Sequence, residues 1–204
     1  MKIVKAIALV LAVAIAGVLL LAATRPTHYR VERSATIAAA PAAVFAQVND
    51  LHRWNAWSPW EKLDPAMKRT YAGPETGPDA SYAWAGNDEV GEGRMTIVES
   101  VPQQRVGIRL EFIKPWTETC QVRFALARQT SGTRVAWSLE GDHNFVSKVM
   151  CVFMDMDKMI GGDFERGLGQ LRTVAEAMPV QPAEAVASEA SGSAPPAPAG
   201  AGDK

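Results

Sequence analysis

The chain has 204 residues, a length that suits one domain with accessory segments. Its 21 basic and 22 acidic side chains give a formal net charge of −1, and no concentration of basic residues predicts binding to nucleic acid or to acidic lipid. The two cysteines, Cys120 and Cys151, match no metal-ligand or redox spacing. We expect two buried thiols, with a disulfide as the alternative in an oxidising compartment.

Residues 1–26 predict a membrane anchor. Residues 6–23 are uncharged and apolar, and as a helix they would reach about 27 Å, close to the hydrocarbon thickness of a bilayer. This run is longer than the apolar part of most cleaved signal peptides, which favours an uncleaved signal anchor over a cleaved signal. Basic residues flank both ends, so charge does not set the orientation. By analogy with signal anchors we predict a single-pass protein of the cell membrane with its domain outside the cytoplasm.

Residues 27–178 form the expected folded domain. A strand is predicted over 28–38, followed by a helix over 41–48 that begins with Pro41, where the missing N–H costs nothing. A second short helix or turn follows through Leu51, Trp54 and Trp57. Residues 59–80 contain many turn formers and predict irregular structure, with one short strand at 67–71.

Apolar and polar residues then alternate over five further segments. These are residues 81–85, 93–101, 105–112, 120–126 and 134–140. Such alternation is typical of an antiparallel sheet with one dry face and one wet face. Apolar residues then recur at steps of three and four from 160 to 178, which predicts an amphipathic helix of about five turns. Residues 179–204 are mostly Ala, Pro, Gly and Ser, and this composition predicts a disordered tail.

The predicted fold class is α+β, a bent antiparallel sheet wrapped around the long C-terminal helix. This element order resembles the helix-grip fold of the START-like (SRPBCC, Bet v 1-like) superfamily, and it is most similar to the bacterial polyketide cyclase/dehydratase-like group. The resemblance rests on Pro-Ala-Ala-Val-Phe at 41–45, Asn-Asp-Leu-His-Arg-Trp at 49–54, Trp-Ser-Pro-Trp at 57–60, Gly-Glu-Gly at 91–93 and residues 153–159. It implies a cavity for a lipid, sterol, polyketide or other apolar molecule, and enzymatic activity in some members.

The candidate ligand-binding residues are those expected on the dry face, at the cavity mouth and on the long helix. They are Trp57, Trp60, Tyr82, Trp84, Met95, Glu99, Leu110, Phe112, Phe124, Trp137, Leu139, Phe164 and Leu168. Each has an alternative interpretation as ordinary core, and the tryptophans at 54–60 either line the cavity mouth or plug one end of the core. Strict alternation places Glu99 on the dry face as a general acid or base, unless a bulge turns it outward.

Three functions follow from these features. The first is a carrier or sensor of an apolar small molecule, favoured because no catalytic constellation, metal-ligand spacing or cofactor motif is present. The second is a cyclase, dehydratase or hydrolase, which would need Glu99, His143 and Tyr82 to converge. The third is an Hsp90-activator-like interaction module. We expect no metal and no cofactor, and the sequence does not specify an oligomeric state.

Overall fold

The computed structural model of the protein describes residues 2–143, 145–153 and 155–178. The predicted disordered tail at 179–204 lies outside these residues. In chain order the elements are α1 (Lys2–Thr24), β1 (His28–Ile37), α2 (Pro41–Val48), the 3-10 helix η1 (Leu51–Ala56), β2 (Lys68–Ala72), β3 (Ser81–Ala85), β4 (Glu92–Val101), β5 (Arg105–Lys114), β6 (Glu118–Gln129), β7 (Gly132–Asp142), α3 (Phe145–Phe153) and α4 (Met156–Glu176).

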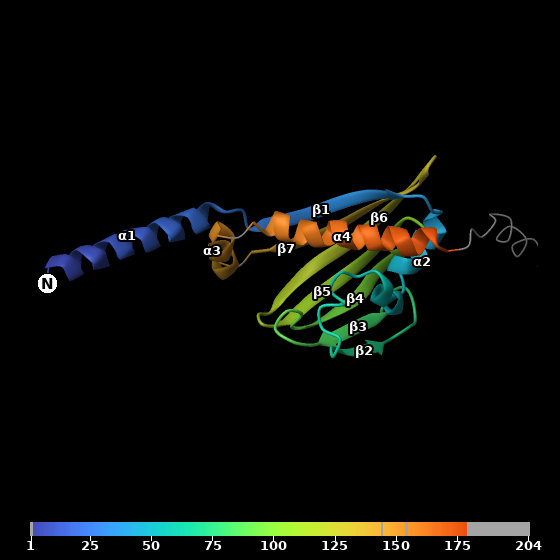
Figure 1. The fold of residues 1–204 in the computed structure, drawn as a ribbon, viewed down its shortest axis with the longest axis horizontal. Coiled ribbons are helices and arrows are strands. Elements are labelled where there is room, and N and C mark those ends of the chain that lie inside the picture. The colour runs from blue at the N-terminus through green and yellow to red at the C-terminus, as the bar shows by residue number, and fades with distance from the viewer. Residues whose placement is uncertain (1, 144, 154, 179–204) are drawn as a thin grey trace, which may run out of the picture.

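Seven strands form one antiparallel sheet in the order β1-β7-β6-β5-β4-β3-β2. The alternation seen in the sequence matches the burial along β6, where every second residue from Cys120 to Leu126 is buried. In Figure 1, α4 runs beside β1, and β2 to β5 curve away from it. The predicted α+β helix-grip architecture is therefore confirmed.

Three helices share the cover of the inner sheet face. Helix α4 contacts β1, α2 and η1, whereas α2 contacts β5, β6 and β7. The sheet is therefore wrapped around α4 and the two short helices together, and not around the long helix alone as the sequence predicted. The reason is that α4 lies close to the edge strand β1, so the short helices pack over the middle of the sheet.

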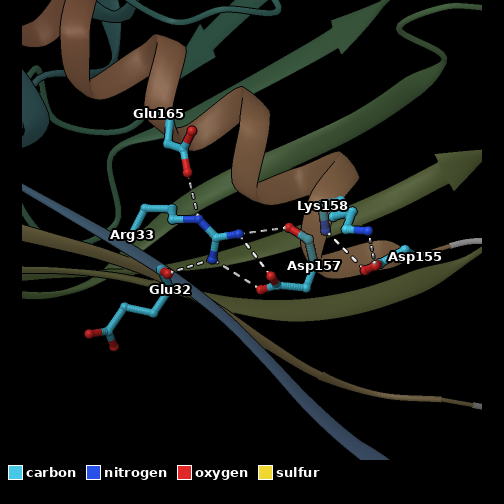
Figure 2. A network of polar contacts seen from close by, with 6 residues as sticks. All are labelled: Glu32, Arg33, Asp155, Asp157, Lys158 and Glu165. Atoms are coloured by element: carbon cyan, nitrogen blue, oxygen red, sulfur yellow. Dashed lines mark hydrogen bonds and ion pairs between the residues drawn. The ribbon is translucent and has the colours of Figure 1, made fainter.

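Arg33 ties α4 to β1 (Figure 2). Its guanidinium group donates to both carboxylate oxygens of Asp157, at 3.0 and 2.8 Å, and to Glu165 at 2.9 Å. A Cβ at Gly161 would lie 2.1 Å from this guanidinium group, so glycine leaves room for the arginine. These hydrogen bonds raise the pKa of Arg33 above its ordinary value and lower the pKa of Asp157 below its ordinary value.

Helix α1 is long and apolar enough to cross a membrane, by length and composition, between Ile3 and Thr24. Only 6% of its most apolar 18-residue segment is buried inside the molecule. A signal sequence passes the same test. Three residues separate α1 from β1, and α3 packs against α1.

Two helix features differ from the sequence-based expectations, and two alternatives that the sequence left open are decided. Helix α3 was not expected, and α4 begins at Met156, four residues before the predicted helix. The pairing of β4 with β5 shifts between Ile97 and Glu99, which is a β-bulge at the exposed Val98. Both cysteines are free thiols, with Cys120 buried and Cys151 half-buried.

Candidate functional site

The inner face of the sheet has a sealed half, built around Trp137 of β7. The Trp137 ring stacks on Phe164 of α4 at 4.1 Å between centroids and on Phe124 of β6 at 4.9 Å. Trp54 and Trp57 meet the same ring edge-on at 6.3 and 5.6 Å. All five side chains are at most 2% exposed. They therefore act as a plug that fills the space between the sheet and α4.

Helix α4 approaches this cluster at Gly167. A Cβ there would lie 2.6 Å from the Trp137 ring, which is closer than van der Waals contact allows. Leu168 is also buried on this side of the helix. The indole Nε1 of Trp137 has no hydrogen-bond partner among the described residues. Aromatic packing, rather than hydrogen bonding, therefore holds the ring in place.

The same face has an open half at the end of β3 and β5. We call Trp84, Leu110 and Phe112 the open strip, because these three apolar side chains are only partly buried. The Trp84 and Phe112 rings meet edge-on at 6.2 Å. Gly93 lies between them in the pairing of β3, β4 and β5, and a Cβ there would lie 2.4 Å from the Trp84 ring. The missing side chain thus lets the Trp84 ring lie over β4.

The remaining predicted apolar residues lie in the core beside the open strip or against the sealed half. Tyr82, Met95 and Leu139 are buried, and Met95 pairs with both Tyr82 and Leu110 across the sheet. Trp60 is partly buried and contacts Trp137 and Phe164 edge-on. It therefore lies against the sealed half while retaining some exposure.

Glu99 is not on the inner face. The bulge at Val98 reverses the alternation, so Glu99 pairs with Gly107 and its carboxylate forms an ion pair with Arg105 at 2.5 Å. Its side chain is 37% exposed. One extra residue moves each following side chain to the other face. Of the two predictions for Glu99, the one with an outward-turning bulge is therefore confirmed, and Glu99 is not a candidate ligand contact.

A buried carboxylate that the sequence analysis missed lies beside the open strip. Glu61 is 8% exposed and accepts from the hydroxyl of Tyr82 at 2.7 Å and from Nε of Arg69 at 2.8 Å. This network ties the irregular segment 57–67 to β2 and β3. Burial and the hydrogen bond to Glu61 raise the pKa of Tyr82, so its phenol stays protonated.

A second polar cluster lies at the end of β1, β6 and β7. The hydroxyl of Tyr29 lies 2.9 Å from Glu118 and 3.3 Å from Sγ of Cys120, and its ring stacks on His143 at 4.3 Å. Burial raises the pKa of Cys120 to about 11 and lowers the pKa of His143. At neutral pH the raised pKa keeps the Cys120 thiol protonated, and a protonated thiol is a poor nucleophile.

Two surface hollows formed by the described residues lie elsewhere. One is lined by residues 38–41 and 128–132, and the other by His52 and residues 71–75. Neither includes the open strip or the space under α4, where the aromatic plug lies. In the described part of the chain, no three His, Cys, Asp or Glu side chains are grouped to hold a metal ion.

The fold and the inner face define a helix-grip domain, and the comparison with family models gives the family. The family model described as polyketide cyclase / dehydrase and lipid transport matches residues 28–176. The chain therefore belongs to this family. No curated protein matches the chain.

Solved structures share the fold at low sequence identity. Protein CV1439 from Chromobacterium violaceum is 14% identical with a TM-score of 0.53, over 76% of this chain and 100% of that chain. The Aha1 dimer from Colwellia psychrerythraea is 14% identical with a TM-score of 0.53, over 73% and 97%. DynU16, from the dynemicin biosynthetic locus, is 17% identical with a TM-score of 0.50, over 72% and 47%. At these identities the likeness concerns the fold alone.

Proposed function

We propose that the chain is a membrane-anchored protein that binds an apolar small molecule, a lipid or an aromatic polyketide-like compound, against the open strip. The observation that carries this proposal is the partial exposure of Trp84, Leu110 and Phe112 on a face that is otherwise dry. Covering these side chains would remove apolar surface from water, which is the main driving force for binding such molecules. The family description, which includes lipid transport, supports the same class of ligand.

Binding without catalysis fits the polar groups better than an enzyme does. The three residues considered for catalysis have separate partners: Glu99 pairs with Arg105, Tyr82 donates to Glu61, and His143 stacks on Tyr29. General acid–base catalysis needs such groups to converge on one reacting position. We therefore assign the chain a carrier or sensor role rather than cyclase or dehydratase chemistry.

In this proposal residues 1–26 are an uncleaved signal anchor that crosses the cell membrane through residues 6–23, and residues 27–178 are the binding domain outside the cytoplasm. The exposed leucines and isoleucines of α1 support the anchor, because a bilayer would cover them. Mass spectrometry of the mature N-terminus tests it. An intact N-terminus is expected, and a new N-terminus after residue 22, 23 or 24 would indicate a cleaved signal.

A titration with a fluorescent fatty acid tests ligand binding. The full chain in nanodiscs should bind it saturably, and Leu110→Asp should weaken binding by about tenfold, because a charged group then faces the ligand. Val98→Asp is the matched control, since Val98 is exposed on the bulge and away from the strip. The probe also partitions into the lipid of the nanodiscs, and this background signal is the same for both variants. Equal affinity in Leu110→Asp and Val98→Asp, or no saturable binding, would contradict the proposal.

A further inference from the structure

Exposed apolar side chains gather at one end of the domain. They come from the β5–β6 hairpin and from α3, and we call them the apolar rim: Ile113, Trp116, Phe145, Met150 and Phe153. Trp116 is 60% exposed and Phe153 is 73% exposed. Soluble surfaces rarely gather large apolar side chains in this way unless a partner covers them.

Contacts along the strand ends bring the two parts of the rim to the same end of the sheet. Glu118 begins β6, two residues after Trp116, and it accepts a hydrogen bond from Tyr29 near the start of β1. Tyr29 stacks on His143, which lies between β7 and α3. The hairpin tip and the start of α3 therefore lie on either side of the Tyr29–His143 stack.

This end of the sheet is also where the apolar helix α1 joins the domain. Only Arg25, Pro26 and Thr27 separate α1 from β1, and three residues span at most about 11 Å. The backbone N–H of His143 donates to the carbonyl of Thr27 at 2.7 Å, and Nζ of Lys148 donates to its Oγ1 at 2.9 Å. Contacts between α1 and α3 also help to keep the linker in place. A membrane that contains α1 would thus lie beside the apolar rim.

We infer that the apolar rim docks on the surface of the same bilayer that holds α1, with Trp116 and Phe153 in the interfacial region. This inference rests on the membrane anchor of the proposed function. Tryptophan is enriched at the level of lipid headgroups, and a short amphipathic helix such as α3 suits the same depth. The short linker favours the bilayer over any other occupant, because it keeps the rim within reach of the lipid surface.

Docking would give the open strip a source of ligand. Phe112 is the chain neighbour of Ile113, and it pairs with Glu118 across β5 and β6. The Phe112 end of the strip therefore lies next to the rim. An apolar molecule would pass between the bilayer and the strip without crossing bulk water, which is costly for such a molecule.

Quenching of tryptophan fluorescence by brominated phosphatidylcholine tests the docking. The full chain is reconstituted in vesicles of this lipid, and the quenched fraction is compared between wild type and Trp116→Phe. Docking predicts a quenched fraction about twofold lower in Trp116→Phe, since Trp116 is exposed on the rim and the other five of the six tryptophans are buried or partly buried. Phe153→Trp in the Trp116→Phe background should restore the quenching.

Equal quenching in wild type and Trp116→Phe, with no gain from Phe153→Trp, would overturn the inference. Cross-linking of rim residues between two copies of the chain, without quenching, would also overturn it and assign the rim to self-association. Resistance to alkaline extraction is measured on the same vesicles. If the chain is extracted, the membrane anchor itself fails; if it resists extraction and is not quenched, only the docking fails.

Discussion

Both halves of the inner sheet face carry aromatic side chains on alternating strand positions, but the two halves pack differently. In the sealed half, Trp137 lies among five aromatic side chains from β6, η1, the segment after η1 and α4. In the open strip, Trp84 and Phe112 contact each other and remain partly exposed. The difference comes from the position of α4 beside β1, which Arg33 and Gly167 permit. Alternation sets which side chains face inward, and helix placement decides which of them become core.

The largest expected effect comes from removing the centre of the sealed half. Trp137→Ala should lower the free energy of unfolding by about 3–5 kcal/mol, because it leaves a cavity that fixed aromatic rings cannot fill. Trp84→Ala should cost clearly less, since its side chain is partly exposed, and should weaken ligand binding. Urea unfolding of the full chain in detergent measures both. Equal destabilisation by the two changes would mean that the halves do not differ.

Breaking the buried network beside the open strip should have the next largest effect. Glu61→Gln removes the charge that pairs with Arg69, whose side chain is 25% exposed. It should lower the free energy of unfolding by about 1–3 kcal/mol, because a charged acceptor in a buried network is lost. Glu111→Gln is the control, because its pair with Arg109 is solvent-exposed and should contribute at most about 1 kcal/mol. Similar losses in the two variants would contradict the structural role given to Glu61.

Two glycines of α4 should respond to alanine with opposite signs. Gly167→Ala places a methyl group against the Trp137 ring and should destabilise the protein by about 1–3 kcal/mol. Gly169→Ala meets no atom within 4 Å and should stabilise it by up to about 1 kcal/mol through helix propensity. Thermal unfolding compares the two. Stabilisation by both changes would show that α4 does not pack closely on Trp137.

The smallest effect concerns the ion pair that holds the start of α4. The Arg33 guanidinium lowers the pKa of Asp157, so the folded state favours the ionised carboxylate. Its contribution to stability is complete above the ordinary pKa of about 4 and is lost as the pH falls through the lowered value. Melting temperatures measured from pH 6 to pH 3 should therefore decline more steeply in wild type than in Arg33→Gln. Parallel declines would exclude this coupling.

Much of the fold was predictable because it depends on local patterns. The alternation in β5, β6 and β7, Pro41 at the start of α2 and the periodicity of α4 each report burial directly. The family description agrees with the resemblance carried by the motifs. Local pattern was therefore enough to place the strands, α2 and most of α4, whereas α3 was not expected.

The site was less predictable because it depends on long-range contacts. Glu61 lies in an irregular segment without periodicity, and its partners Arg69 and Tyr82 come from two strands. The bulge at Val98 adds one residue that no pattern marks, so alternation could not decide the face of Glu99. Nothing in the sequence indicated which apolar residues of the inner face would be covered by helices and which would stay partly exposed. That depends on the path of α4, which Arg33 fixes from another part of the chain.

The most direct test of the account asks which half of the inner face holds the ligand. A fatty acid carrying a photoreactive diazirine is bound to the full chain in nanodiscs and cross-linked, and the labelled residues are mapped by mass spectrometry. The account predicts adducts at Trp84, Leu110 or Phe112 that excess unlabelled fatty acid removes. Competed adducts at Trp137, Phe164 or Leu168 instead would show that the sealed half opens for the ligand, and would contradict the account.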